Sequence, residues 1–440
     1  MKKLIIVFTL IVSLVMLMGC NNPSSLSFEA TIPSQLIVNE SFTVTATTED
    51  EKAILASNLS ISIKAGQSFV TVSGLTITGI AAGQVTITIT YTLDGKTATK
   101  DYTFTVVEPE IVYGIPEPQT GFYMKDADVI EENNNRLIVF VTNKTSGEED
   151  NVIKAMQGTY HENKGHAYGN AMTILQPSQS GWDRFIGGPT IVKGTFAYNS
   201  TNYQYLMAYQ GTNLANENAF SIGFAVSNNP LEGWVKVGTE PVLNYDRAVY
   251  GESYAGYYAP SLVNLNKGSI VRLFFTWADA FGHFSYFVDI NAANLNAMDI
   301  SGFAMLPNHG NLSSGEDVTM IPNGSFAYDA TNNIFYMVKD YSPTPSREPR
   351  VATRIELAKI NEAELYTAKK LIGWQSIRLY DMFDTPETAY ERLYSGVIVK
   401  DQYGHIINAN KIEIIYNVSD LEADNPNYIF SQKFLTFTYE

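Results

Sequence analysis

The sequence predicts an all-β fold, with an N-terminal β-sandwich followed by a five-bladed β-propeller. The first observation is that residues 29–108 alternate Thr, Val and Ile with polar residues between Gly and Asn turns. The second is a pattern that occurs five times after residue 120: a short apolar strand, a turn and an aromatic-rich strand. Its copies begin roughly 55 to 80 residues apart, the size of a four-stranded blade with long loops.

The N-terminus has the composition of an export signal. In residues 1–19, two lysines precede a long apolar run, and a small residue stands before Cys20, the only cysteine. The ending LMGC resembles a bacterial lipobox, which implies that Cys20 becomes the lipidated first residue of the mature chain. We therefore expect a protein that is lipid-anchored to the cell membrane and faces the extracellular side. The alternative is an uncleaved anchor helix.

Residues 20–28 are expected to form a polar tether, and residues 29–108 contain about seven short strands, as in a β-sandwich. The stretch FVTVSGLTITGIAAGQVTITITY resembles the bacterial immunoglobulin-like group 2 domains. This resemblance implies a spacer that holds the next domain away from the membrane. Direct adhesion to a glycan or protein is the alternative. Residues 109–120 are rich in proline and predict a stiff linker.

Residues 121–440 carry the five repeats of the predicted propeller. The expected opening strands are residues 126–130, 187–192, 258–263, 316–321 and 394–399. The expected second strands are residues 136–141, 203–209, 269–277, 333–338 and 411–416. One helical pattern, NEAELYTAKKL at residues 361–371, is expected to decorate the edge of a blade.

Composition narrows the range of partners. The chain has 29 Lys and Arg against 45 Asp and Glu, a net charge of −16, which repels nucleic acid while a neutral glycan is indifferent to it. A single cysteine allows no disulfide within the chain. No metal-ligand spacing, phosphate-binding glycine loop or nucleophile elbow is present in the sequence. We expect a monomer with no metal, no cofactor and no nucleic-acid partner.

A motif in the second repeat resembles a known family. Its pattern, A-x-S-x-x-P-x-x-x-W, is carried by Ala225, Ser227, Pro230 and Trp234 and is closed by Pro-Val-Leu. This looks like the outer part of a blade in five-bladed glycoside hydrolases, above all family 43 with its relatives in families 32 and 130. A weaker similarity covers residues 120–440. The resemblance implies an inverting glycosidase for arabinose- or xylose-containing glycans, with carboxylates from blades one, three and four.

Two acids match the family pattern. The family has Asp-Pro-x-Val in blade one, so Asp126 matches the general base, and Asp128 on the same side of the strand is its possible support. The family has Glu-Gly-Pro in blade four, and here Glu316 matches the general acid. Its neighbour Asp317 would help to raise the pKa of that acid by repulsion.

Blade three departs from the pattern. The family's tuning aspartate precedes a proline, and this chain has Ala259 there; the nearest upstream acids are Glu252 and Asp246. Loss of one member of a catalytic unit should leave a slow enzyme. Two alternatives stay open. One is a catalytically inactive glycan-binding surface lipoprotein, and the other is a hydrolase or phosphorylase of a neighbouring family with a two-residue mechanism.

Three residues complete the expected site as substrate-binding groups. Arg184 can grip a sugar hydroxyl or carboxylate with two hydrogen bonds, and its neighbour Asp183 either pairs with it or contacts substrate. Tyr258 belongs to the opening of the third repeat, and His309 precedes the fourth. His405, just after the fifth opening, is a further candidate.

Overall fold

The computed structural model divides the chain into two compact units, Met1–Ile111 and Val112–Glu440. It describes residues 26–107, 113–118, 121–144, 151–213, 219–246, 256–279, 282–298, 300, 302–307, 310–312, 323–341, 352–366, 373–381, 384, 392–419 and 431–438. The expected export signal and Cys20 lie outside these ranges. Within them, no helix has both the length and the apolar character needed to cross a membrane.

The first unit consists of three small sheets around one hydrophobic core. Their strands are β1 (Phe28–Thr31) with β4 (Thr45–Thr48); β2 (Gln35–Ile37), β9 (Lys96–Val107), β8 (Gly83–Leu93) and β5 (Leu59–Ala65); and β3 (Ser41–Thr43), β7 (Thr76–Gly79) and β6 (Val70–Ser73). A short 3₁₀ turn, η1 (Ala56–Asn58), precedes β5. Along β8, Val85, Ile87 and Ile89 are fully buried while the threonines between them are not, as the two-residue strand period requires.

In its described residues, the second unit contains five sheets. The first contains β13 (Gly165–Tyr168), β12 (Val152–His161), β11 (Asn135–Lys144), β10 (Phe122–Glu132) and β29 (Lys400–Asp401), with β14 (Met172–Leu175) beside β12. The second contains β15 (Phe185–Tyr198), β16 (Thr201–Thr212), β17 (Ser221–Ser227) and β18 (Val235–Lys236). The third contains β19 (Gly256–Asn264), β20 (Ile270–Asp279), β21 (Gly282–Asn291) and β22 (Ala304–Met305).

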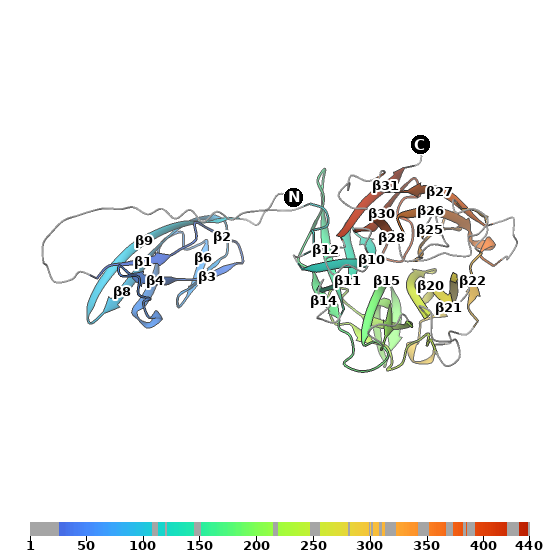
Figure 1. Cartoon of the computed structure of the whole chain (residues 1–440), viewed down its shortest axis with the longest axis horizontal. Coiled ribbons are helices and arrows are strands. Elements are labelled where there is room, and N and C mark those ends of the chain that lie inside the picture. Colours follow the sequence, from blue (N-terminus) through green and yellow to red (C-terminus); the bar gives the residue numbers. More distant parts are fainter. Residues whose placement is uncertain are drawn as a thin grey trace. The chain divides into compact units, whose positions relative to one another are not determined.

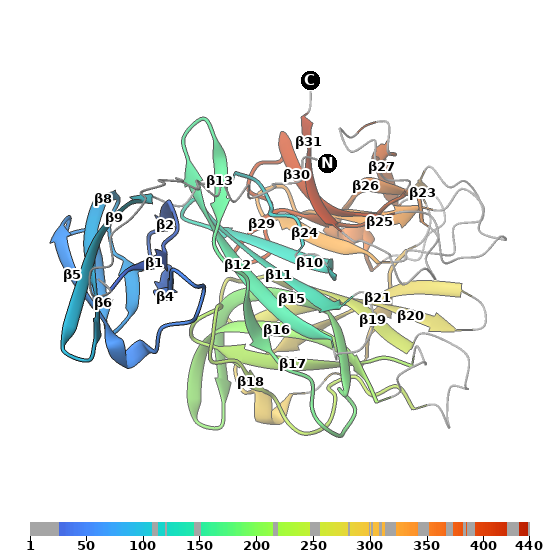
Figure 2. The same cartoon turned by 60° about the vertical axis from the view of Figure 1, so that its left-hand side comes forward.

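The fourth sheet contains β23 (Gly310–Asn311), β27 (Trp374–Tyr380), β26 (Arg354–Asn361), β25 (Ile334–Tyr341) and β24 (Ser325–Asp329). The fifth contains β28 (Arg392–Ile398), β30 (Lys411–Ser419) and β31 (Ser431–Thr438). Figure 1 shows the five sheets arranged around a common centre, and Figure 2 shows the antiparallel run from β10 to β13 from the side. The first strands contact one another in cyclic order: β10 with β15, β15 with β19, β19 with β24, β24 with β28, and β28 with β10.

All five expected second strands are confirmed. They correspond to β11, β16, β20, β25 and β30, and β20 and β25 each begin one residue later than expected. Two expectations for the fourth repeat do not match the residues that the structure describes. Its first strand is β24, which pairs with β25, whereas the sequence pattern suggested residues 316–321, which lie outside the described residues. Of the expected helix at 361–371, the described part forms only the 3₁₀ turn η4 (Glu362–Glu364).

Each first strand enters the centre of the unit through a turn with the same backbone conformation. Its first residue has a left-handed φ close to +50° in every sheet: Asp126, Gly188, Ala259, Asn323 and Ser395. In four sheets the strand register shifts at this point, as it does at a β-bulge. We call these five positions the entry turns. Because they share a conformation, they identify equivalent positions in the five sheets independently of sequence.

A loop between β28 and β30 joins the far ends of the first strands. Lys193 N donates to Gln402 O at 2.6 Å, Asn264 N to Tyr403 O at 2.8 Å, and Tyr328 N to Gly404 O at 3.1 Å. Strand β29 of the same loop pairs with β10 in parallel. Residues 400–406, here called the central loop, therefore bind all four other sheets.

His405 belongs to this central loop and is held by the backbone of another sheet. Its ring is buried, and Nε2 lies 2.8 Å from the backbone oxygen of Asn264. Burial lowers its pKa, so the ring is held neutral. His405 is thus a structural residue and not the substrate-binding residue that its position in the sequence allowed.

Adding a single methyl group at Gly404 is expected to destabilise the second unit strongly. Its φ is +85°, and a Cβ would lie 2.9 Å from Leu262 O and 3.0 Å from Val263 Cα. We expect Gly404→Ala to lower the free energy of unfolding by about 2 kcal/mol or more, from left-handed strain plus the clash. Gly302→Ala, with φ +80° and no neighbour within 4 Å, is the matched control for strain alone. Tryptophan fluorescence during denaturation measures both, because all four tryptophans lie in the second unit; equal losses would contradict the clash.

The motif in the second sheet builds the outer turn between β17 and β18. Ser227 Oγ lies 2.7 Å from Asn229 O and 2.6 Å from Glu232 O, and Trp234 Nε1 donates to Pro230 O at 3.1 Å. The motif therefore stabilises a turn at the outer edge of the second sheet and contributes nothing to the central pocket.

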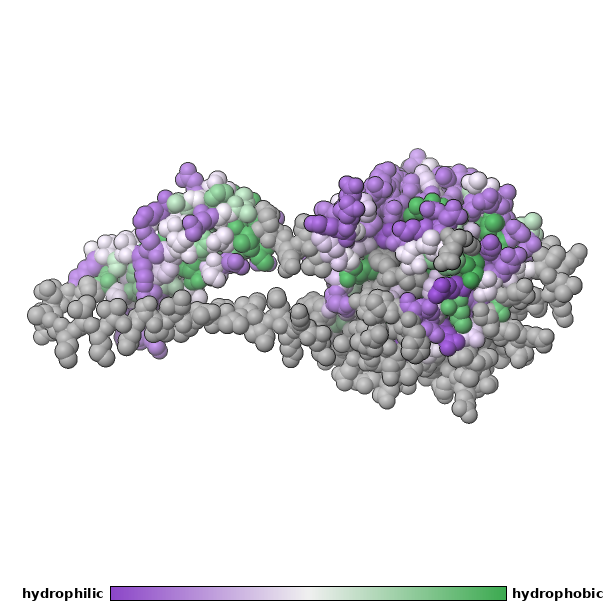
Figure 3. Space-filling model, turned by 90° about the horizontal axis from the view of Figure 1, so that it is seen from above, coloured by the Kyte–Doolittle hydropathy of each residue, from purple (hydrophilic) through white to green (hydrophobic). Residues whose placement is uncertain are grey.

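The described surface in Figure 3 is mostly polar, with small apolar patches.

Candidate functional site: the central pocket

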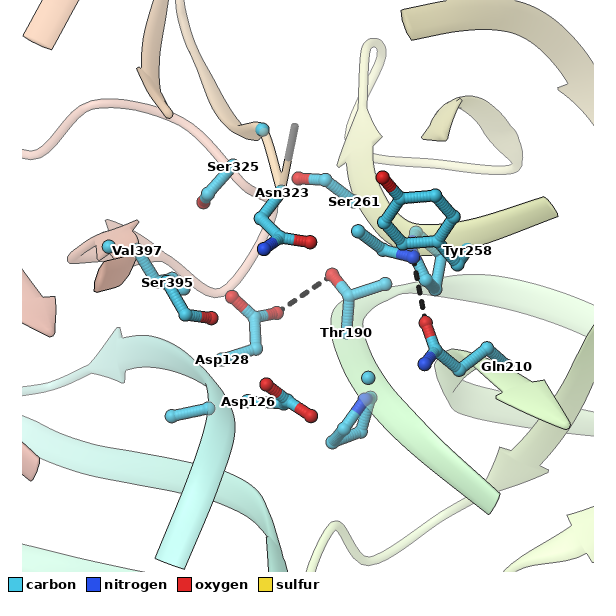
Figure 4. A pocket seen from close by; sticks show the side chains of 17 residues that line it. Asp126, Asp128, Thr190, Gln210, Tyr258, Ser261, Asn323, Ser325, Ser395 and Val397 are labelled. Carbon is cyan, nitrogen blue, oxygen red and sulfur yellow. Dashed lines mark hydrogen bonds between the residues drawn. The ribbon is translucent and has the colours of Figure 1, made fainter. Parts of the chain in front are cut away.

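The five entry turns enclose a cavity of about 90 Å³. Each turn contributes three consecutive residues: Asp126–Asp128, Gly188–Thr190, Ala259–Ser261, Asn323–Ser325 and Ser395–Val397, joined by Gln210 and Tyr258. Figure 4 shows their side chains converging on this space. The volume admits several water-sized groups, so it suits one part of a polar ligand better than a whole large one.

Asp126 is the one carboxylate among the five left-handed entry positions. About 30% of its side chain is exposed, and Lys125 Nζ lies 4.0 Å from its Oδ2. Aspartate tolerates left-handed backbone better than most residues, because its short polar side chain can hydrogen-bond locally. The turn therefore holds a charged, accessible acceptor at the edge of the cavity.

Asp128 also lines the cavity, but its charge is already satisfied. Its side chain is about 4% exposed and lies 2.9 Å from the fully buried Lys400 Nζ. Its other oxygen accepts hydrogen bonds from Thr190 Oγ1 at 2.8 Å and from Ile191 N at 2.9 Å. These three contacts hold the carboxylate in place between two sheets, so we assign Asp128 to the scaffold.

The third residue of each of the first three entry turns ties its sheet to the next one. Asp128 Oδ2 accepts from Ile191 N, Thr190 Oγ1 accepts from Leu262 N at 3.1 Å, and Ser261 Oγ accepts from Phe326 N at 3.0 Å. The positions are equivalent, since each donor directly follows the third residue of the following turn. A polar residue at this place thus holds the cavity wall together.

The third entry turn presents backbone and aromatic groups in place of a carboxylate. Ala259 N donates to Gln210 Oε1 at 2.8 Å, a contact visible in Figure 4. Burial raises the pKa of Tyr258, and the charge of Asp340 adds to this effect, so the phenol stays neutral. Tyr258 was expected at the site and does line the cavity. Ala259 leaves this turn without an acid.

Behind the fourth and fifth turns lies a buried acid that the sequence pattern did not single out. Asp340 on β25 is about 4% exposed; it accepts hydrogen bonds from Asn323 Nδ2 at 2.7 Å and from Ser395 N at 2.5 Å. Burial raises its pKa to about 6, although both hydrogen bonds and the charges of Arg392 and Lys339 act against the rise. An aspartate at the end of the apolar run IFYMV was the signal available in the sequence.

Arg184 and Asp183 lie away from the cavity. Asp183 is buried and pairs with Lys236 Nζ at 2.6 Å and Tyr209 OH at 3.0 Å, rather than with its neighbour. The guanidinium of Arg184 stacks over Phe185. Neither residue belongs to the walls that the five turns form.

Glu316, Asp317, Glu252 and His309 lie outside the described residues, so their places stay predictions. The structure does show that the entry turn of the fourth sheet begins at Asn323, followed by Gly324. That position is equivalent to Asp126 and Ala259. The resemblance put Glu-Gly-Pro at the opening of this blade, and the equivalent residues here are Asn-Gly-Ser.

The described part of the chain contains no group of three His, Cys, Asp or Glu that could hold a metal ion. The cavity offers one accessible carboxylate, two amides, several hydroxyls and a tyrosine ring. Such a set of neutral donors and acceptors around one charge can recognise a polyhydroxylated molecule by hydrogen bonds and ring contact.

No family model matches the chain, and no curated protein matches it. Solved structures with a similar fold include an α-L-arabinofuranosidase from Lactobacillus brevis, at 10% identity and TM-score 0.48, covering 74% of this chain and 94% of that one. A GH43_1 enzyme from Xanthomonas citri complexed with xylotriose has 12% identity and TM-score 0.48, covering 74% and 90%. An endo-arabinase from Bacteroides thetaiotaomicron VPI-5482 has 9% identity and TM-score 0.44, covering 72% and 94%. At these scores the likeness says nothing about which residues act.

Proposed function

We propose that this protein is a surface lipoprotein that binds neutral glycans in the central pocket of a five-bladed β-propeller and does not hydrolyse them through the family-43 set of carboxylates. The observation that carries the proposal is the chemistry of the five entry turns. Of Asp126, Gly188, Ala259, Asn323 and Ser395, only the first is an acid. Glycoside hydrolysis by inversion needs two carboxyl groups about 6.5 to 9.5 Å apart.

The propeller architecture is supported by the closed order of the first strands and by the five entry turns. The ligand class is supported by the pocket itself. Amide, hydroxyl and backbone groups suit sugar hydroxyls, and the net charge of −16 disfavours polyanions. Arabinose- and xylose-containing glycans, which the sequence resemblance suggested, are the first ligands to test.

Hydrolysis is the second candidate, and the exposure of Asp126 favours it. A carboxylate that reaches the cavity is placed as a general base would be. Its acid would be Glu316, with Asp317 beside it, in the stretch of sequence just before Asn323. A two-residue hydrolase or phosphorylase of a neighbouring family would use the same pair.

Asp126→Asn separates the two candidates. If the protein only binds glycans, affinity for arabino- and xylo-oligosaccharides falls roughly tenfold to a hundredfold, because a hydrogen bond to a charged acceptor is worth about 1.5–3 kcal/mol. Calorimetry measures affinity, and release of aryl groups from a panel of glycosides measures turnover. Asp384→Asn, at a surface ion pair with Arg378, is the control. Turnover by the wild type that Asp126→Asn abolishes would favour the hydrolase, and neither binding nor turnover would reject both.

The anchor and the first unit complete the proposal. The three sheets of the first unit share one core, which supports an immunoglobulin-like domain acting as a spacer between membrane and pocket. The lipobox-like ending supports a lipid on Cys20 and a position on the extracellular side.

Cys20→Ser tests the anchor directly. With no thiol to accept lipid, the variant is expected to be released into the medium or to stay unprocessed, whereas the wild type partitions with membranes. Fractionation with detergent-phase separation and mass measurement of the N-terminal peptide distinguishes these outcomes. Membrane association unchanged by the substitution would instead identify residues 1–19 as an anchor helix.

A further inference from the structure

Two side chains, Gln210 and Asp340, occupy equivalent positions around the pocket, but only one of them can carry a charge. In the second sheet, Gln210 stands two residues after Ala208, which pairs with Thr190. In the fourth sheet, Asp340 stands two residues after Val338, which pairs with Ser325. Each side chain accepts a hydrogen bond from the backbone N–H of the following entry turn, Ala259 N for Gln210 and Ser395 N for Asp340. Of these two acceptors, Asp340 is the one that can carry a charge.

The charge of Asp340 decides the orientation of a neighbouring amide. An ionised carboxylate has no hydrogen to donate, so the Asn323 side chain must turn its Nδ2 toward Asp340, at 2.7 Å. The amide oxygen of Asn323, on the opposite side of the Cβ–Cγ axis, then points away from Asp340. Asn323 lines the cavity, and Figure 4 shows its side chain extending into the space between Ser395 and Tyr258.

We propose that Asp340 is a positioning residue for glycan recognition, which fixes the amide of Asn323 so that its oxygen accepts a hydrogen bond from a ligand hydroxyl. This inference rests on the proposed binding function of the pocket. The same side chain also holds the fifth entry turn through Ser395 N. The carboxylate of Asp340 thereby holds both the fourth and the fifth entry turns.

A consequence is that ligand affinity depends on pH. Burial raises the pKa of Asp340 to about 6. The charged groups facing it are Lys339 on its own strand and Arg392 on β28, with Tyr258 from β19. Below that pH the carboxyl carries a proton and can donate it, so the Asn323 amide can turn and present its NH₂ to the pocket. A ligand hydroxyl then loses its acceptor, and affinity falls roughly threefold to tenfold, the value of one neutral hydrogen bond.

Asp340→Asn is expected to keep the Asn323 amide turned at every pH, with its NH₂ toward the pocket. The side-chain oxygen left at this position still accepts from Ser395 N, and the new NH₂ faces Asn323, which must offer its oxygen to it. We expect the variant to bind arabino- or xylo-oligosaccharide at pH 7.5 as weakly as the wild type does at pH 5, with little change between the two. Calorimetry at both pH values measures this, and thermal melting checks that the variant is folded.

A double-mutant cycle separates positioning from a general structural role. Asn323→Ala removes the acceptor, so adding Asp340→Asn to it should change affinity no further; an additive loss would overturn the proposal. Affinity of the wild type that is the same at pH 5 and pH 7.5 would also overturn it. A second readout needs no ligand: the side-chain amide NMR signal of Asn323, assigned by its loss in Asn323→Ala, should shift with a midpoint near pH 6 and stay fixed in Asp340→Asn. A wild type that binds no glycan at any pH rejects the binding function, and an amide signal that does not titrate rejects the positioning role.

Discussion

Replacing Lys400 by Met is expected to lower the free energy of unfolding of the second unit by about 3–5 kcal/mol at pH 7. Lys400 Nζ is fully buried and lies 2.9 Å from Asp128 Oδ1. Removing one partner of a buried pair leaves the other charge desolvated and unpaired, which costs far more than a surface pair contributes. Tryptophan fluorescence in a denaturant titration measures the loss in this unit alone, because all four tryptophans belong to it.

Two variants sharpen this result. Asp128→Asn in the Lys400→Met background removes the orphaned charge while keeping an oxygen for Thr190 and Ile191, so it should recover a large share of the lost stability. Arg378→Met breaks an exposed pair with Asp384, and its cost should stay below about 1 kcal/mol. Equal losses for Lys400→Met and Arg378→Met would contradict the role given to the buried pair.

The second strands could be predicted because each is an apolar, aromatic-rich run with a buried face. Residues 203–209 and 411–416 show this signal, which depends only on burial within one sheet. The first strand of the fourth sheet could not be found in the same way. Residues 316–321, EDVTMI, place two acids before a largely apolar run, whereas the entry turn of the fourth sheet begins with Asn323 and Gly324, residues typical of loops.

The entry turns share a backbone conformation, but several residue types can adopt that conformation, so the sequence does not identify it reliably. Aspartate, glycine, alanine, asparagine and serine all occupy the same left-handed position. Only asparagine, aspartate and glycine favour it, so Ala259 gave no signal of its own. For the same reason, the sequence did not show that Asn323 opens the fourth sheet with the backbone conformation of Asp126.

The roles that the sequence could not assign, those of Asp340 and His405, depend on distant partners. Asp340 holds Ser395, 55 residues later, and His405 binds the backbone of Asn264, 141 residues earlier. No local pattern carries such a pairing. Asp126, by contrast, could be predicted because it combines a turn, a strand opening and a motif match within a few residues.

Restoring two acids is expected to give the pocket hydrolytic activity. In Ala259→Asp with Asn323→Glu, carboxyl groups would stand at three equivalent entry positions, 126, 259 and 323. The first would act as base, the second would tune the acid, and the third would be the acid. Aspartate suits the left-handed φ of +48° at position 259 better than alanine does. Turnover of aryl arabinosides and xylosides should appear above a wild-type background, and the product anomer should be inverted if a water fits between acid and base.

Asp340 is the reason to expect an acid at position 323 to work. The amide of Asn323 lies 2.7 Å from that carboxyl, so a glutamate there would face a second buried acid, and repulsion between the two would hold one proton near neutral pH. A general acid held protonated contributes roughly a hundredfold to ten-thousandfold when the leaving oxygen is basic. The variant with Gln in place of Glu at 323 is the isosteric control: it should match the Glu variant on dinitrophenyl glycosides, whose leaving group needs no proton, and fall behind it on alkyl glycosides. Equal rates of the two variants on both substrates would show that the fourth entry turn cannot deliver a proton, and turnover by the wild type itself would show that the acid comes from elsewhere in the chain.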